Sequence, residues 1–353
     1  MPRRTSLRWL AGAAAAMIIT GVAACGSGAA SSTGSGGMPT VTLMVGGIDK
    51  QIYLPYQLAQ GLGFYRKYGV DVQLSTESAG GVGAEDAMAS GQVDMAGAWY
   101  VHTIDFQLAG KQVEDIAQLS GAPGEREMCA TGSRVTSPAQ WRGQSVGVTD
   151  IGSGTDDLTL YMAARYHLTT RDFSRVAVGD GDTFLAALAH HKIVCGMTTQ
   201  PTVTAVEKKG VGYSAFDLAA SAGVQRWLGG FWPTAGVLAR TDWVSSHKAT
   251  AQKVVDALVA TMHWIATHSA AQIAAHLPAD FVSNALITRA DYVKALTADK
   301  TQFLPDGMMP ASGPATVLAV EKLAGKITGP VNLATTYTNS FVINANKKLG
   351  FSK

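Results

Sequence analysis

A helix–turn–strand pattern occurs twice in this chain, in residues 84–98 and again in residues 184–197. In the first copy an apolar helical segment turns at Ser90-Gly91 into a strand of small residues, and the second copy turns at His190-His191. A helix and a strand of this kind bury their apolar faces only against neighbouring elements of a sheet. Two copies separated by a long stretch of chain therefore predict two α/β lobes, each built on its own sheet.

The segment before the first copy predicts a β–α–β unit. Residues 41–45 are a short apolar strand, residues 52–68 carry apolar side chains at helical spacing, and residues 70–74 alternate apolar with polar side chains. Two parallel strands joined in this way need a right-handed crossover. Further strands are expected in four segments, residues 115–119, 127–131, 144–148 and 236–240.

These strands also indicate where the chain passes between lobes. We expect crossings in the strands near Met128 and Val237. Lobe I then contains residues 41–128 and 241–353, the latter mainly helical, and lobe II contains residues 129–240. Two connections form a hinge, and the cleft between hinged lobes is the natural place for a ligand. The expected fold class is α/β, with two Rossmann-like lobes around a central ligand cleft.

Residues 1–24 have the features of an export signal. Arginines precede an apolar run in residues 9–20, which is shorter than the roughly 20 residues that a membrane-spanning helix needs. Val22-Ala23-Ala24-Cys25 resembles the bacterial lipobox, whose cysteine is acylated and becomes the first residue of the mature chain. The alternative is ordinary cleavage beside an incidental thiol. The pattern predicts a lipoprotein on the outer face of the cell membrane and leaves Sec and twin-arginine export open.

Composition favours a tethered globular protein. Residues 25–40 are almost entirely Gly, Ser, Ala and Thr, which predicts a flexible tether. The chain carries a net charge of +2, and loss of the three arginines in residues 1–24 leaves −1. Nucleic-acid binding needs a strong positive field, so no nucleic-acid partner is expected. With 47% hydrophobic and only 15% charged residues, the chain can build a large core.

Cys129 and Cys195 are the other two cysteines. An exported chain folds in an oxidising compartment, where these two can form a disulfide, or they can remain two buried thiols. His190-His191 lies near Cys195, but the histidines occupy an exposed turn and no second cluster has the spacing of metal ligands. We therefore expect neither a metal nor a cofactor.

Catalytic motifs are also missing from the sequence. It contains no Gly-x-Ser-x-Gly elbow, no phosphate-binding loop that ends in Lys-Ser/Thr, and no His-Glu-x-x-His pair. Together with export and tethering, this favours a binding protein over an enzyme, and we expect no catalytic residues.

Candidate ligand contacts lie where the expected strands end. In parallel α/β sheets, ligands gather beyond the carboxyl ends of the strands, where helix amino termini also converge. The glycine, polar and aromatic residues at these positions are therefore the predicted binding residues. They are Gly47, Asp49, Gln51, Tyr53, Trp99, His102, Gly121, Ser153, Gly154, Thr155, Asp182, Thr199, Gln200 and Trp232.

The chemistry of these residues leaves alternatives open. Free N–H groups at a helix start near Thr155 can hold a sulfonate, carboxylate or phosphate. Ser153 or Thr155 can instead simply cap that helix, and the acidic residues that follow favour a cap. Asp49 and Asp182 can accept a cationic amine, or they can be solvated turn residues. Trp99 can stack on a ligand or only pack between lobes.

Four segments in a fixed order resemble a known family. They are residues 56–72 (YQLAQGLGFYRKYGVDV), 88–94 (MASGQVD), 141–148 (WRGQSVGV) and 336–342 (TYTNSFV). Together they resemble the nitrate, sulfonate, taurine and thiamine-pyrimidine-precursor binding proteins of ABC importers. The resemblance implies a periplasmic-binding-protein-like fold of type II with a two-strand hinge, a monomer, a small-molecule solute, and a membrane permease with its ATPase as partner.

The resemblance does not name the solute. Our first expectation is a small organic anion such as an alkylsulfonate or taurine, or nitrate. An aromatic or heterocyclic nutrient such as a pyrimidine or a flavin is the alternative, because Tyr53, Trp99, Tyr100 and Trp232 can form an aromatic cage. Some members of the wider family are pyrimidine-making enzymes with clustered cysteines, which this sequence lacks. An exported enzyme of the same fold is the remaining alternative.

Overall fold

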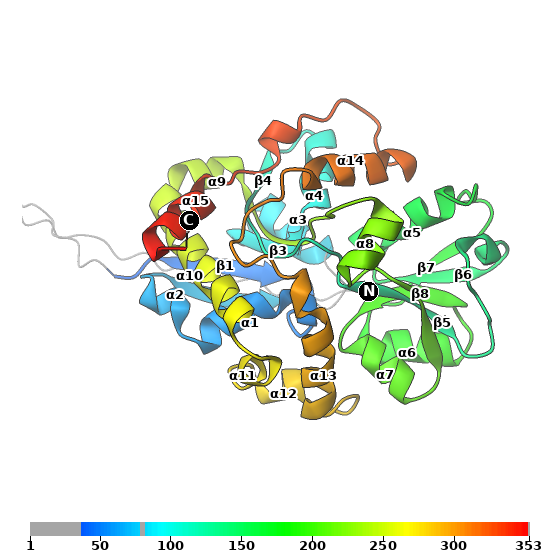
Figure 1. The fold of residues 1–353 in the computed structure, drawn as a ribbon. Helices are drawn as coiled ribbons and strands as arrows, with labels where there is room; N and C mark the ends of the chain where they lie inside the picture. The colour runs from blue at the N-terminus through cyan, green and yellow to red at the C-terminus, as the bar shows by residue number, and fades with distance from the viewer. Residues whose placement is uncertain (1–36, 78–81, 352–353) are drawn as a thin grey trace, which may run out of the picture. The chain divides into compact units, whose positions relative to one another are not determined.

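Two five-stranded sheets form the framework of the protein (Figure 1). The computed structural model describes residues 37–77 and 82–351. The expected signal in residues 1–24, Cys25 and residues 26–36 of the expected tether lie outside the described residues. Both sheets belong to one compact unit that begins at Met38.

The first sheet has the strand order β2–β1–β3–β10–β4. β1 pairs in parallel with β2 and β3, whereas β10 is antiparallel to both β3 and β4. All of β3 is buried, as expected for a small-residue strand that is covered on both faces. The strands are β1 (Thr40–Val45), β2 (Asp71–Thr76), β3 (Met95–Trp99), β4 (Val113–Gln118) and β10 (Ala235–Arg240).

The second sheet repeats this plan with the order β7–β6–β8–β5–β9. β6 is parallel to β7 and β8, and β5 is antiparallel to β8 and β9. In each sheet the antiparallel strand is the one that the chain enters directly after leaving the other sheet. The strands are β5 (Glu125–Ala130), β6 (Ser145–Val148), β7 (Ser174–Ala177), β8 (Cys195–Thr199) and β9 (Gly212–Asp217).

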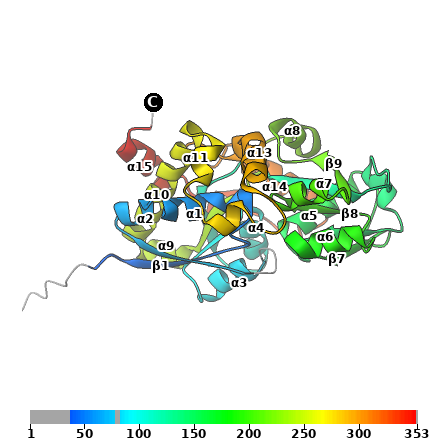
Figure 2. The same ribbon diagram turned by 90° about the horizontal axis from the view of Figure 1, so that it is seen from below.

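Helices cover both faces of the first sheet (Figure 2). α3 (Val82–Ser90) packs on the face that contains Ala98 and Leu238. α10 (Lys248–Thr267) belongs to the main core cluster, which covers the opposite face through residues such as Val237. The sheet is therefore buried on both sides, in agreement with the apolar strands.

Most helices before β10 follow a strand, which places their amino termini at the carboxyl ends of strands. These elements are η1 (Gln51–Tyr53), α1 (Leu54–Gly61), α2 (Phe64–Lys67), α4 (Val101–Leu108), η2 (Pro138–Trp141), α5 (Gly154–Ala164), α6 (Gly181–Ala189), α7 (Thr202–Lys208) and α8 (Ser221–Leu228). The chain after β10 is mainly helical, as expected. It forms α9 (Thr241–Ser246), α10, α11 (Ala270–Ala274), α12 (Ala279–Val282), α13 (Arg289–Asp299), η3 (Lys300–Gln302), α14 (Gly313–Leu323), η4 (Leu333–Thr335) and α15 (Ser340–Leu349).

The two crossings between the sheets run side by side. The chain leaves the first sheet after β4 through residues 119–124 and returns from β9 to β10 through residues 218–234. The Thr234 N–H donates to the Ser120 carbonyl (3.2 Å), and the Trp232 N–H donates to the Gly121 carbonyl (3.0 Å). The hinge is therefore two hydrogen-bonded segments.

The expected lobe boundaries differ from these crossings. A boundary at residue 128 falls inside β5, which pairs wholly with the second sheet, and a boundary at residue 240 assigns β10 to the wrong sheet.

The single helix expected in residues 52–68 is interrupted and forms α1 and α2 instead. Gly63 adopts φ 68°, a left-handed conformation that ends α1 and allows α2 to begin in a new direction.

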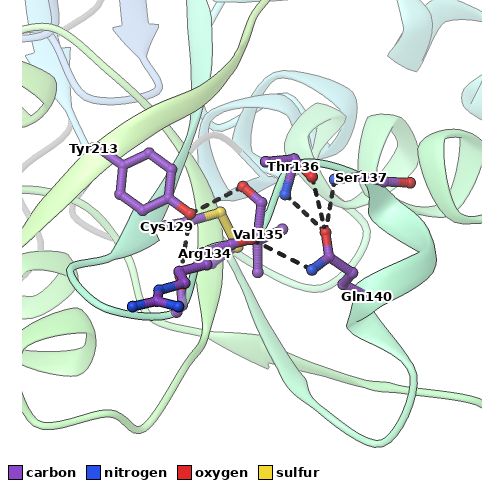
Figure 3. Close-up of a disulfide and its surroundings, with 9 residues drawn as sticks. Cys129, Arg134, Val135, Thr136, Ser137, Gln140 and Tyr213 are labelled. Atoms are coloured by element: carbon purple, nitrogen blue, oxygen red, sulfur yellow. Dashed lines mark hydrogen bonds between the residues drawn. A yellow bond between two sulfur atoms is a disulfide. The ribbon is translucent and has the colours of Figure 1, made fainter.

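A disulfide joins Cys129 of β5 to Cys195 of β8, and both residues are buried. The two lie opposite each other in the antiparallel register, with their Cα atoms 3.9 Å apart. Figure 3 shows the bridge beside the turn that leads to η2, where the Tyr213 hydroxyl donates to the Val135 carbonyl (2.9 Å). The bond closes a sequence separation of 66 residues within the second lobe.

Replacing both cysteines with alanine is expected to lower the free energy of unfolding by about 2–4 kcal/mol, because the open chain regains loop entropy in its unfolded state. Urea titration followed by tryptophan fluorescence measures this loss. Wild-type protein unfolded under reducing conditions is the control and should match the variant. Equal urea midpoints for the variant and the oxidised wild type would contradict a stabilising disulfide.

Candidate functional site

A small buried cavity lies where the carboxyl ends of strands from both sheets meet. Its volume is about 20 Å³, close to the space that one water molecule needs. The first lobe contributes Lys50, Ile52, Tyr53, Glu85, Trp99 and His102 to its lining. The second lobe contributes Glu125, Thr149, Gly154 and Thr155. The lobes are therefore closed on each other at this point.

Direct contacts between the lobes surround the cavity. The Gln51 N–H donates to the Gln200 carbonyl (3.0 Å), and the Lys50 ammonium lies 2.9 Å from a carboxylate oxygen of Asp180. Trp99 packs directly on the backbone of Gly154. A Cβ atom on residue 154 would lie only 1.9 Å from the Trp99 ring. Only glycine permits this approach, so the start of α5 carries no side chain where the lobes meet.

Aromatic side chains form one wall of the site. Trp99 lies edge-on to Trp232, with ring centroids 5.4 Å apart. The Tyr53 and Trp99 side chains are hydrogen-bonded to each other. Trp232 is fully buried and its indole N–H has no hydrogen-bond partner. Through Tyr53 and Trp99, these rings present apolar surface to the cavity.

Carboxyl groups form much of the remaining lining. His102 Nε2 lies 3.0 Å from a Glu85 carboxyl oxygen, and His102 Nδ1 lies 3.2 Å from Asp105. Burial raises the pKa of Glu85, although His102 opposes the rise. Burial disfavours the charge on His102, but Glu85 and Asp105 outweigh it and raise the pKa of that imidazole. One proton is therefore held strongly between the two groups.

Glu125, the first residue of β5, brings a second carboxyl group to the cavity. Its side chain is 2% exposed, and its Oε2 has no hydrogen-bond partner. Burial raises the pKa of Glu125 to about 8, and Lys50 opposes the rise. Glu127, two residues farther along the same strand, is also buried without partners, but it does not line the cavity.

Side chains at the start of α5 accept hydrogen bonds from N–H groups of the loop that precedes the helix. The Gly152 N–H donates to the Asp156 carboxylate (2.9 Å), and the Thr149 N–H donates to the Thr155 hydroxyl (3.0 Å). Ser153 caps α5 through the Asp156 N–H. These bonds agree with the capping interpretation of the loop, and they do not include the N–H groups of Gly154 and Thr155, the first two residues of α5.

The structure brings together only part of the predicted set. Five of its residues line the cavity: Tyr53, Trp99, His102, Gly154 and Thr155. Four more pack directly around it: Gln51, Gln200, Ser153 and Trp232.

The other predicted residues lie elsewhere. Thr199 and Gly121 lie at the hinge, where the Thr199 hydroxyl donates to the Gly124 carbonyl (2.7 Å). Gly47 and Asp49 line a separate depression next to Lys50. Asp182 is exposed in the first turn of α6, and Asp180 makes the contact between lobes in its place.

Sequence reasoning missed the charged members of the site, Lys50, Glu85 and Glu125. Charged side chains are usually exposed, so their burial here depends on the meeting of two lobes. One signal was present for Glu125, which directly follows the glycine- and proline-containing crossing in residues 121–124.

Comparison with known proteins identifies the family. The model of the family described as NMT1/THI5 like matches residues 52–272, which is more than half of the chain. The chain belongs to the NMT1/THI5-like family. No curated protein matches it in sequence.

Solved members of this fold extend over nearly the whole chain. A protein from Bordetella bronchiseptica RB50 has a TM-score of 0.81 at 28% identity, covering 88% of this chain and 98% of its own. A putative periplasmic sulfonate-binding protein, SsuA, from Methylobacillus flagellatus KT has a TM-score of 0.65 at 18% identity, covering 90% and 96%. The periplasmic nitrate-binding protein NrtA from Synechocystis PCC 6803 has a TM-score of 0.70 at 15% identity, covering 89% and 90%.

The last two likenesses show the fold alone. The expected family and the two-lobe α/β fold are thus confirmed, and the fold of this NMT1/THI5-like chain is that of the solute-binding proteins of ABC import systems.

Among residues 37–77 and 82–351, no group of three or more His, Cys, Asp and Glu side chains is arranged to hold a metal ion. Within those same ranges, no helix combines the length and the apolar character that crossing a membrane requires.

The closed arrangement should depend on the absence of a side chain at Gly154. Gly154→Ala places a methyl group against Trp99, and relieving this overlap is expected to cost on the order of 1–3 kcal/mol. Small-angle X-ray scattering should therefore show a larger radius of gyration for the variant. Gly329→Ala is the control, because the nearest atom to its Cβ would be 3.6 Å away. An unchanged radius for Gly154→Ala would mean that this contact does not hold the lobes together.

A buried ion pair should link the carboxyl-terminal segment to the second lobe in a pH-dependent way. Lys326 lies 2.7 Å from the fully buried Asp157 of α5. Burial raises the pKa of Asp157 to about 6, with Asp105 adding to the rise. Lys326 opposes that rise, so Lys326→Met raises the pKa of Asp157 further and removes the ion pair that the wild type forms above about pH 6. Below that pH the wild-type carboxyl group is largely neutral, so the pair contributes less there. The expected loss is about 1–3 kcal/mol at pH 8 and clearly less at pH 5, measured by urea unfolding.

The matched control for this prediction is Lys348→Met. Lys348 pairs with the buried Asp256 of α10 (2.6 Å), within the first lobe. Both variants should lose stability, but only Lys326→Met should enlarge the radius of gyration. If the loss from Lys326→Met were the same at both pH values, the pH-dependent link would be wrong.

Proposed function

We propose that this chain is the extracytoplasmic, lipid-anchored solute-binding component of an ABC importer, and that it closes two lobes over a small solute. The observation that carries the proposal is the buried polar and aromatic cavity between two sheets that are joined by a two-segment hinge. Solutes bind in such crevices beyond the strand ends of α/β sheets. The family and the fold support the same function.

Movement of the lobes is part of this proposal. A cavity of about 20 Å³ is smaller than a nutrient molecule, so a solute enters only when Trp99 and Gly154 separate. The two hinge segments can bend without breaking either sheet, because their hydrogen bonds join the segments to each other. A solute favours closure only by interacting better with the closed arrangement than with the open one.

The partner and the location follow from the same proposal. A permease with its ATPase would take the solute from the closed, monomeric protein. Acylation of Cys25 and the tether that follows it would keep the protein near that permease, which raises its effective concentration there. The lipid anchor remains a proposal from the sequence pattern.

A ring-shaped nutrient fits the site better than the sulfonate, taurine or nitrate expected first. Tyr53 and Trp99 line the cavity with aromatic surface on which a planar heterocycle can pack, and Trp232 supports Trp99 from behind. In the loop before α5, the Thr149 and Gly152 N–H groups already have side-chain partners, and the partner of Gly152 is the Asp156 carboxylate, whose negative charge disfavours a bound anion. A pyrimidine or a flavin is therefore the solute class that we propose, and binding without chemical change is the activity.

Binding should stabilise and compact the full chain. A thermal-shift screen over pyrimidines, flavins, alkylsulfonates and nitrate identifies the solute, because a ligand that binds the native state raises its melting temperature. Scattering should then show a smaller radius of gyration than for an opened variant such as Gly154→Ala. Mass spectrometry of the recovered ligand should show it unchanged. A ligand recovered as a different compound would favour the exported enzyme.

Trp99→Ala should weaken binding of the identified solute at least tenfold, because it removes the ring surface at the centre of the site. Trp243→Ala is the matched control, since Trp243 stacks on His247 outside the cavity. Isothermal titration calorimetry measures both affinities. Equal affinities for wild type and Trp99→Ala would remove Trp99 from the binding surface.

A further inference from the structure

One cavity-lining side chain still has a buried atom without a partner. Among the described residues that line the cavity, Glu125 alone has a buried polar atom, Oε2, that forms no hydrogen bond. Gln51 and Trp232, which also have an unpaired buried polar atom, pack behind this lining. The other charged groups of the lining are engaged. Lys50 contacts Asp180 and donates to the Gly46 carbonyl (3.1 Å), and His102 lies between Glu85 and Asp105. The lining therefore has a spare hydrogen-bond acceptor and no spare cation.

An unpaired buried carboxyl oxygen is costly to maintain. Burial removes the hydrogen bonds that such an acceptor makes to water without replacing them, and the cost is larger when the group is charged. Glu125 is also placed for contact with a guest, because it begins β5 directly after the hinge crossing and faces the other lobe across the cavity. A donor on a solute would remove this cost only when the lobes close over it.

The approach to the cavity is also acidic. A depression of about 400 Å³ shares Lys50 with the cavity and is lined by four acidic side chains, Asp49, Glu77, Asp180 and Asp280. Three of these, Asp49, Glu77 and Asp280, belong to the first lobe and Asp180 belongs to the second. Among the described residues that line the depression, Lys50 is the one basic residue. Clefts lined by one sign of charge attract ligands of the opposite sign. This second observation favours a solute that is positively charged over one that is negatively charged.

We infer that Glu125 is the recognition group of the site, and that it accepts a hydrogen bond from an amino or amidine-type nitrogen on a ring-shaped solute. The solute class is therefore a nitrogen-bearing ring that carries N–H donors or a positive charge, and ring-shaped acids are excluded. This inference rests on the proposed function, because it assigns the chemistry of the same cavity.

The charges around Glu125 set the sign of the pH dependence. Lys50 and Arg126 favour its anion, whereas Asp180 disfavours it. Glu127 on the same strand and Glu85 with His102 across the cavity are the other titratable neighbours. Since the pKa of Glu125 is raised to about 8, the group is mostly protonated below that pH. The affinity for a cationic ring should therefore increase as the pH rises through about 8.

The experiment compares rings of equal size that differ in one group. Benzamidine carries a cationic donor, benzamide a neutral one, and benzenesulfonate an anion. Calorimetric titration of the full chain should rank them in that order of affinity, with benzamidine binding at least tenfold more tightly than benzenesulfonate. Repeating the benzamidine titration between pH 6.5 and 9 tests the increase with pH.

Two isosteric variants distinguish ligand recognition by Glu125 from the general effect of removing a buried carboxyl group. Glu125→Gln should reduce benzamidine affinity at least tenfold, change benzamide affinity little, and abolish the dependence on pH. Glu127→Gln is the matched control, because Glu127 is an equally buried, unpartnered carboxyl group on the same strand that does not line the cavity. It should leave all three affinities and the pH profile unchanged. Urea unfolding of both variants checks that each remains folded.

The outcomes distinguish this inference from the proposed function. Tighter binding of benzenesulfonate, or equal effects of Glu125→Gln and Glu127→Gln on benzamidine, would overturn the role of Glu125 while a solute-binding site remains. If neither these probes nor any nutrient in the thermal-shift screen bound the chain, the proposed function would fail, and the inference with it.

Discussion

The two hydrogen-bonded hinge segments determine most of what this protein can do. Residues 119–124 and 218–234 are held together by backbone bonds at Ser120, Gly121, Trp232 and Thr234, so the sheets cannot separate fully or slide past each other. Each sheet contributes parallel strands whose carboxyl ends face the hinge region. Rotation about these segments is the large motion that such bonds still permit, and it is the motion by which the proposed closure would bring Trp99 onto Gly154.

Where the lobes meet, ionisable groups lie in a low-dielectric interior, and they occur there in two arrangements. Some are paired across the interface, as Lys50 is with Asp180 and Lys326 is with Asp157. Others are buried as carboxyl groups whose pKa values burial raises, as in Glu85 and Glu125. Burying an ion pair seldom adds much stability, but removing one partner is strongly unfavourable. Such pairs therefore specify how the lobes meet more than they strengthen the contact.

Much of the fold was predictable because strand periodicity is a local property. The expected strands at residues 115–119, 144–148 and 236–240 agree with β4, β6 and β10 to within a few residues. β7 and β9 were not predicted, since their half-exposed sequences, SRVA and GYSAFD, show no clear apolar alternation. The crossings were misplaced for a related reason. The strands on either side of the first crossing, VEDIAQ and EREMCA, both mix charged with apolar residues, so their periodicity does not mark where each strand ends. The glycine- and proline-containing residues 121–124 are the signal for the crossing.

The site was less predictable than the fold, because its chemistry depends on pairs of residues from different lobes. The rule about strand ends found Trp99 and Gly154, but their contact across the interface needs both lobes in place. The same limit applies to acidic residues. Asp180 and Asp182 lie two residues apart in a similar sequence context, but Asp180 immediately precedes α6 and contacts Lys50, whereas Asp182 is exposed in the first turn of the helix.

Glu125 shows why binding and closure belong to one event. Its carboxyl group lies at the first residue after the hinge, so the group is in the same place in the second lobe whether the lobes are open or closed. What changes is its surroundings, because closure removes water from Oε2 and brings Lys50 and Glu85 opposite it. A solute that donates to this oxygen is bound weakly by the open protein, where water competes, and strongly by the closed one. That difference in affinity is what a hinged binding protein needs in order to close on the right molecule.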